Sequence, residues 1–151
     1  MTAYGTIPEI ELKLKKGTVE KIKICTSADC FQAMKLFYNE DTVYLCETFI
    51  VLFLNRNNLT IGWLKVSQGG ISGTVVDIKL IMATALKMAA CGMILSHNHP
   101  SGNCFPSEAD KDLTRRIKAA AALFDIVVLD HVIVGDLEDS QYLSMADEGL
   151  I

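Results

Sequence analysis

The chain has 151 residues, of which 50% are hydrophobic and 21% are charged, and its formal net charge at pH 7 is -4. This length is typical of one globular domain with its own core, and no apolar run is long enough to span a membrane. The acidic balance argues against a broad nucleic-acid surface, because such surfaces use Lys and Arg to neutralise phosphates. The first residues lack the pattern of a signal peptide, so we expect a cytoplasmic protein.

The first predicted element is a hairpin over residues 8–25, where Ile and Leu alternate with Lys on either side of Gly17. Its basic residues are Lys13, Lys15, Lys16, Lys21 and Lys23. We interpret this cluster as the solvated face of the hairpin rather than as a nucleic-acid contact. The open edges of such a hairpin would allow two chains to form a homodimer by strand pairing.

The later elements alternate between helix and strand patterns. We expect a helix over 29–38, strands over 48–55 and 59–67, a buried helix over 77–90, a strand over 93–97, a helix over 108–123 and a strand over 126–134. A glycine-rich connection over 68–73 follows the second strand, and Phe49 and Trp63 should pack within the sheet. The order of elements predicts a single α/β (α+β) domain with helices flanking a mixed sheet.

Five cysteines lie at positions 25, 30, 46, 91 and 104, an odd count without a C-x-x-C pair. This pattern predicts reduced thiols rather than a disulfide framework or a structural zinc site. We expect Cys91, in an apolar stretch, to lie in the core. Cys104 is a loop residue without a chemical role, an oxidation-sensitive thiol or a soft metal ligand.

Two histidines, His97 and His99, stand two residues apart at the end of the strand predicted over 93–97. On an extended chain, residues i and i+2 project to the same side, so both imidazoles can reach one ion. Asp110 lies in the first turn of the helix predicted over 108–123. Two imidazoles and one carboxylate leave the fourth position of tetrahedral zinc open for water, which is typical of a catalytic site.

Each part of this pattern also has a purely structural explanation. Ser107-x-x-Asp110 is typical of a helix N-cap, and paired histidines in a turn are often only exposed polar residues. His131 lies on a strand that we expect to place Leu129 on the same face and Asp130 on the opposite one. We interpret His131 as a hydrogen-bonded structural residue, and expect neither His131 nor Asp130 to be needed for metal binding.

The sequence resembles the RadC-like proteins of the JAB/MPN superfamily, whose JAMM motif is a distant Glu, then H-x-H, seven residues and S-x-x-D. Here seven positions, 100–106, separate His99 from Ser107, and residues 129–135 and 144–149 are also similar to the family. The resemblance is distinctive over 44–151 and weaker over 1–43, so a single RadC-like JAB/MPN domain is expected over 1–151. It implies a mostly antiparallel mixed sheet with cytidine-deaminase-like layering.

The resemblance further implies a site. The Glu of the family precedes an early strand in the form E-x-F, which corresponds here to Glu47-Thr48-Phe49. Glu47 would be the general base, and Ser107 would donate a hydrogen bond to the oxyanion. The implied ligands of one Zn²⁺ per chain are His97, His99 and Asp110. The implied reaction is hydrolysis of an amide bond in a peptide or an isopeptide-linked protein.

Two other functions remain open. The family is associated with DNA repair, which suggests a nuclease or accessory role, but the helix-hairpin-helix region common at the N-terminus of such proteins is expected to be lacking here. A non-catalytic MPN binding module could use zinc only to order the loop 100–106. Within that loop, Asn103-Cys104-Phe105 departs from many relatives, so we expect different substrate contacts there.

Overall fold

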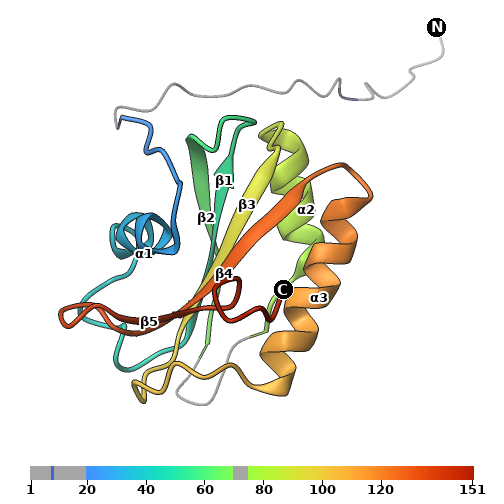
Figure 1. Cartoon of the computed structure of the whole chain (residues 1–151). Helices are drawn as coiled ribbons and strands as arrows, with labels where there is room; N and C mark the ends of the chain where they lie inside the picture. Colours follow the sequence, from blue (N-terminus) through green and yellow to red (C-terminus); the bar gives the residue numbers. More distant parts are fainter. Residues whose placement is uncertain (1–7, 9–19, 70–74) are drawn as a thin grey trace, which may run out of the picture.

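The computed structural model describes residue 8 and residues 20–69 and 75–151 (Figure 1). Most of the hairpin predicted over 8–25, with three of its five lysines, therefore lies outside the described residues, as does most of the connection 68–73. In the described part of the second arm, Lys23 forms an isolated antiparallel bridge with Leu59 instead of a strand. This segment is held to the later hairpin by a bond from the Ile24 N–H to the Asn58 carbonyl, 2.9 Å.

Among the described residues, five strands form one sheet in the order β2-β1-β3-β4-β5. They are β1 (Thr48–Leu54), β2 (Thr60–Gln68), β3 (Gly92–Asn98), β4 (Val127–Asp136) and β5 (Gln141–Ser144). Only β3 and β4 are parallel, and every other pair is antiparallel. The mixed, mostly antiparallel sheet confirms the predicted fold class. The sequence analysis missed β5, because four residues are too short to show a strand period.

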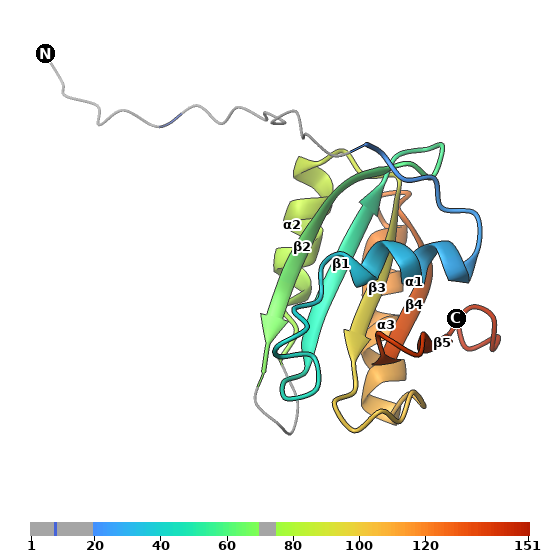
Figure 2. The ribbon, with the colours of Figure 1, turned by 90° about the vertical axis from the view of Figure 1, so that its left-hand side faces the viewer.

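In the described part of the chain, three helices cover the two faces of this sheet: α1 (Ser27–Lys35), α2 (Ile78–Lys87) and α3 (Glu108–Ala122). Figures 1 and 2 show α1 on one face, and α2 with α3 on the other, so that the sheet is the middle of three layers. None of the helices in the described ranges is long and apolar enough to cross a membrane.

The strand β1 belongs to both cores, since all its residues are buried. Ile50, Leu52 and Leu54 join the cluster that packs under α1, whereas Phe49, Val51 and Phe53 join the cluster under α2 and α3. Burial on both faces explains why β1 reads as a continuous apolar run. It also makes β1 a fully buried neighbour of β3, which carries His97 and is directly followed by His99.

Three sequence expectations about packing were wrong or too broad. Trp63 is 47% exposed and stacks on Phe37, with ring centroids 4.5 Å apart. It lies on the edge strand β2, where the helices cover only part of the sheet. Helix α2 buries only one face, and Leu80 and Leu86 on it are exposed.

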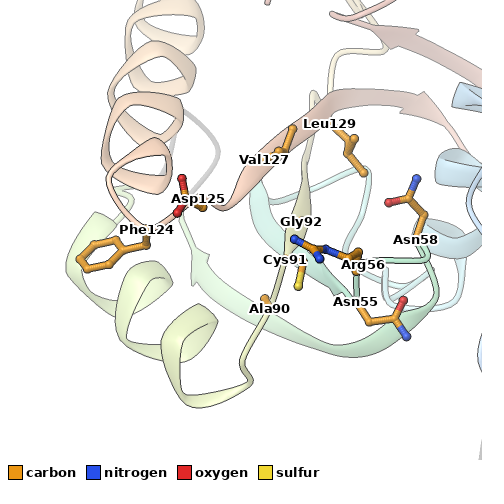
Figure 3. A pocket seen from close by; sticks show the side chains of 10 residues that line it. All are labelled: Asn55, Arg56, Asn58, Ala90, Cys91, Gly92, Phe124, Asp125, Val127 and Leu129. Atoms are coloured by element: carbon orange, nitrogen blue, oxygen red, sulfur yellow. The ribbon is translucent and has the colours of Figure 1, made fainter.

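Cys91 is exposed and not part of the core. It precedes β3 at the end of the sheet away from the histidines, where it lines a hollow with Arg56, Asp125 and Val127 (Figure 3). Cys91 lies between α2 and β3, at the open end of the strand. Apolar neighbours in the sequence do not show that a residue lies at such an exposed end.

Candidate metal centre

The structure brings His97, His99 and Asp110 together. Within the described part of the chain, they form the one group of three or more His, Cys, Asp or Glu side chains that could hold a metal ion, with ligand atoms all within 4.8 Å of one another. The two Nε2 atoms are 2.9 Å apart. The Asp110 carboxylate faces both rings, with Oδ1 3.3 Å from Nε2 of His97 and Oδ2 3.4 Å from Nε2 of His99.

The end of β3 and the start of α3 position these side chains, the first by strand alternation and the second by helix capping. Strand alternation in β3 turns His97 toward the α3 face and Asn98 away from it. At the start of α3, the Ser107 N–H donates to Oδ2 of Asp110 at 2.8 Å, and the Asp110 N–H donates to Oγ of Ser107 at 3.1 Å. This capping box confirms the N-cap interpretation, and it also aims the carboxylate at the histidines. Among the described residues, no acceptor takes the Ser107 hydroxyl hydrogen.

The protonation of these groups suits a cation. Nδ1 of His99 lies 2.6 Å from the carbonyl oxygen of Asn103, which can only accept, so the hydrogen sits on Nδ1 and the neutral ring has its lone pair on Nε2. Burial alone would raise the pKa of Asp110, but its close contacts with the rings of His97 and His99 outweigh burial and hold that pKa far below its usual range. An ionised carboxylate beside two imidazole nitrogens fits a divalent transition metal.

The Asp110 carboxylate has the opposite effect on its neighbour. Its hydrogen bond raises the pKa of His99, while partial burial of the ring opposes the rise. In the absence of a metal, a proton shared between His99 and Asp110 can take the position of a cation. A metal that binds there must therefore displace protons from its ligands.

Glu47 lies directly before β1 and is half-buried. In the antiparallel pairing of β1 with β3, Phe49 faces His97, and continuing this register by two residues sets Glu47 across from His99. Its negative charge contributes to the raised pKa of His99. Glu47 is therefore a neighbour of the candidate centre without being one of the three grouped ligands.

The sequence model of the RadC-like JAB domain family matches residues 24–150. The chain belongs to this family. It is 42% identical over 139 residues to a UPF0758 protein of Flavobacterium johnsoniae, and the matched region covers 92% of this chain and 55% of that protein. It is 46% identical over 105 residues to a UPF0758 protein of Porphyromonas gingivalis, 70% of this chain and 45% of that protein.

The chain thus spans about half the length of these relatives. The name UPF0758 protein states no reaction, whereas membership of the RadC-like JAB family suggests a metallohydrolase. The three grouped side chains lie within the matched residues.

In this RadC-like JAB domain, Asn98 joins the metal-ligand strand to the segment that carries Glu47. Its Oδ1 accepts from the Thr48 N–H at 2.7 Å, and its Nδ2 donates to the carbonyls of Val43, 2.6 Å, and Cys46, 2.8 Å. The side chain is 1% exposed. Sequence reasoning missed this role, although a polar residue at the middle of H-x-H in a buried strand must find partners on the opposite face.

His131 is fully buried beside the candidate ligands of the RadC-like JAB domain. Its Nε2 lies 2.7 Å from Nδ1 of His97, and its Nδ1 lies 2.6 Å from Oγ1 of Thr114. Burial lowers its pKa well below the usual value, so the ring is neutral. His131 is hydrogen-bonded as expected, but a β-bulge at Leu129 breaks the predicted alternation, and Leu129 packs under α1 instead. Asp130 lies on the opposite face as expected and accepts from Ser144 Oγ, 2.6 Å.

The loop 100–106 between the ligands packs on β4. A Cβ atom added at Gly135 would lie 2.5 Å from Sγ of Cys104 and 2.6 Å from the carbonyl oxygen of Gly102. Cys104 is half-buried in this contact and is not one of the grouped ligands, which favours its interpretation as a loop residue. Phe105, which sequence reasoning flagged as a departure from relatives, is 75% exposed.

Proposed function

We propose that this protein is a zinc-dependent metallohydrolase that cleaves an amide bond in a peptide or an isopeptide-linked protein. The observation that carries the proposal is the group of two imidazoles and one ionised carboxylate, whose ligand atoms lie within 4.8 Å of one another. Such a set leaves one position of a tetrahedral ion open, unlike the closed set of a structural zinc site. Family membership supports the hydrolase class.

The chemistry divides between the ion and the chain's own residues. A zinc ion held by these ligands would lower the pKa of a bound water to about 7 and so supply hydroxide at neutral pH. Glu47, across the sheet pairing from His99, would accept a proton from the attacking water and pass it to the leaving amine.

Ser107 would stabilise the oxyanion that forms during attack. Its oxygen already accepts the Asp110 N–H, so its orientation is fixed while its own hydrogen is free to donate. Removing a donor with this role from an oxyanion hole costs about 2.7–4 kcal/mol of transition-state stabilisation. The capping box would therefore serve both the helix and the reaction.

The metal content tests the first half of this proposal. We expect about one zinc per chain, by elemental mass spectrometry, in protein purified without a metal-binding tag. Asp110→Ala should lose the metal because it removes the only carboxylate of the set. Wild-type protein that folds and stays empty when zinc is supplied would contradict the proposed function.

Glu47→Gln tests the second half. The variant keeps the size of the side chain but cannot accept a proton, so we expect full zinc content with turnover reduced by a factor of about 10²–10⁴. Cleavage can be followed by mass spectrometry on mixed peptides and on isopeptide-linked substrates. Turnover at the wild-type rate in Glu47→Gln would exclude this residue as the general base.

A further inference from the structure

A line of hydrogen bonds connects two candidate ligands through two residues that are not ligands. It starts at the backbone carbonyl of Asp110, which lies 2.7 Å from Oγ1 of Thr114. Thr114 contacts Nδ1 of His131 at 2.6 Å, and Nε2 of His131 contacts Nδ1 of His97 at 2.7 Å. Thr114 and His131 are 0% exposed and His97 is 1% exposed, so solvent does not compete for these bonds.

The chemistry of the groups fixes the direction of every bond. A carbonyl oxygen only accepts, so the single hydroxyl hydrogen of Thr114 is used on Asp110. Oγ1 can then only accept from His131, which places the hydrogen of that neutral ring on Nδ1. Its Nε2 consequently accepts from Nδ1–H of His97. The Nε2 of His97 is left with a lone pair facing Asp110 and His99.

We propose that Thr114 and His131 are positioning residues that hold His97 in the tautomer able to bind a metal through Nε2. This inference rests on the proposed function in assuming that a metal binds there. It also has a structural side, because the line of bonds joins α3, β4 and β3 and so sets the spacing of two ligands on different elements. Outer-shell partners of this kind fix both the tautomer and the orientation of a metal-binding histidine.

Without the Thr114 hydroxyl, the direction of the hydrogen bond between His131 and His97 can reverse. His131 loses the acceptor for its Nδ1–H and can move the hydrogen to Nε2, where it donates to Nδ1 of His97. The hydrogen of His97 then sits on Nε2 and points at the metal position. Zinc binding must restore the first tautomer, and affinity falls.

The test compares three threonine variants. Thr114→Val removes the hydroxyl at nearly constant shape, whereas Thr114→Ser keeps it. Thr84→Val on α2 is the matched control, because Thr84 makes the same bond to the carbonyl four residues earlier, 2.8 Å to Leu80, without a histidine partner. Zinc dissociation constants are measured by competition with a chromophoric chelator, and histidine tautomers by ¹⁵N NMR of the metal-free protein above the usual histidine pKa.

We expect Thr114→Val to weaken zinc binding by about 10–100-fold and to show a hydrogen on Nε2 of His97. Thr114→Ser and Thr84→Val should bind zinc like the wild type. A folded Thr114→Val protein with unchanged zinc affinity and unchanged tautomers would overturn the proposal.

The wild-type NMR spectrum keeps the test decisive if Thr114→Val does not fold. Hydrogens on Nδ1 of both His97 and His131 support the proposal, and a neutral His97 with its hydrogen on Nε2 overturns it. A wild-type protein that binds no zinc would refute the proposed function, but the tautomers would still show whether Thr114 and His131 orient His97.

Discussion

Asp110 serves two structural roles with one side chain. Its carboxylate closes the capping box with Ser107 and at the same time faces Nε2 of His97 and His99. Because capping and metal binding both require the ionised form, they reinforce rather than exclude each other. The sequence leaves open whether Asp110 caps a helix or binds a metal. In the structure the two roles are compatible at this position.

The paired His99 and Asp110 predict how the stability of the zinc-free protein depends on pH. Folding raises the pKa of His99 above the usual histidine value of 6.5. Such a group stabilises the fold at pH values below the usual pKa, and this contribution is lost as the pH rises through the folded pKa. Asp110, whose pKa is lowered, stays ionised throughout that range. We therefore expect the thermal unfolding temperature of chelator-treated protein to decrease as the pH rises from about 6 to about 8.

Asp110→Asn provides the control, since it removes the charge that raises the pKa of His99. The difference between the pH profiles of wild type and variant isolates this pair from the other titrating groups. Superimposable profiles would contradict the coupling. Zinc should bind more weakly at the acidic end, because it must displace the proton from His99.

At the level of elements, the site depends on how the loop 100–106 rests on β4. The loop begins at the end of β3 and leads to α3, so its path sets the distance between His99 and Asp110. Gly135 allows the loop to approach, since a Cβ atom there would collide with Cys104 and with the backbone of Gly102. A glycine in a strand is often the mark of such a close approach.

Gly135→Ala should therefore disturb the site from outside it. We expect a loss of about 1–3 kcal/mol in the free energy of unfolding, as for other overpacked positions, together with weaker zinc binding. Gly92→Ala is the control, because its added Cβ meets neighbours only at 3.5 Å or more. Urea unfolding and chelator competition measure the two effects, and equal behaviour of the two variants would contradict this account.

At the scale of the whole molecule, the site combines parts that lie far apart in the chain. The proposed base precedes β1, whereas His97 lies in β3, His99 directly follows β3 and Asp110 lies in the first turn of α3. Asn98 joins these parts, since its side chain forms hydrogen bonds with the backbone of Val43, Cys46 and Thr48. Figure 1 shows these segments meeting at the same end of the sheet.

Asn98→Ala should separate folding of the ligand set from placement of Glu47. Loss of the amide leaves buried backbone groups unpaired, so we expect a cost of about 1–3 kcal/mol in unfolding free energy. Zinc content should persist while turnover falls. Asn39→Ala, which removes an exposed bond to Asp41, should change stability by no more than about 0.5 kcal/mol.

Unfolding in urea, elemental analysis and peptide cleavage measure the three quantities for Asn98→Ala and its control. Loss of zinc from a folded Asn98→Ala protein would show that the residue supports the ligands themselves. Unchanged turnover would show that the Glu47 segment does not need this anchor.

Local patterns were sufficient for much of this protein. Strand and helix periodicity and the capping box predicted most of the described elements near their observed bounds, and the spacing of His97, His99 and Asp110 predicted the three side chains that the structure groups. These features depend on neighbours a few residues away, which the sequence displays directly.

What only the tertiary structure decided are the contacts between distant segments. The pairing of β1 with β3 set Glu47 opposite His99. The bulge at Leu129 turned the Leu129 side chain away from the sheet face of His131. The exposure of Trp63 followed from its place on an edge strand. The line of hydrogen bonds that links His97, His131 and Thr114 likewise requires three elements at once. Sequence periodicity reports the face of each element, but the partner on that face is set by how the whole chain packs.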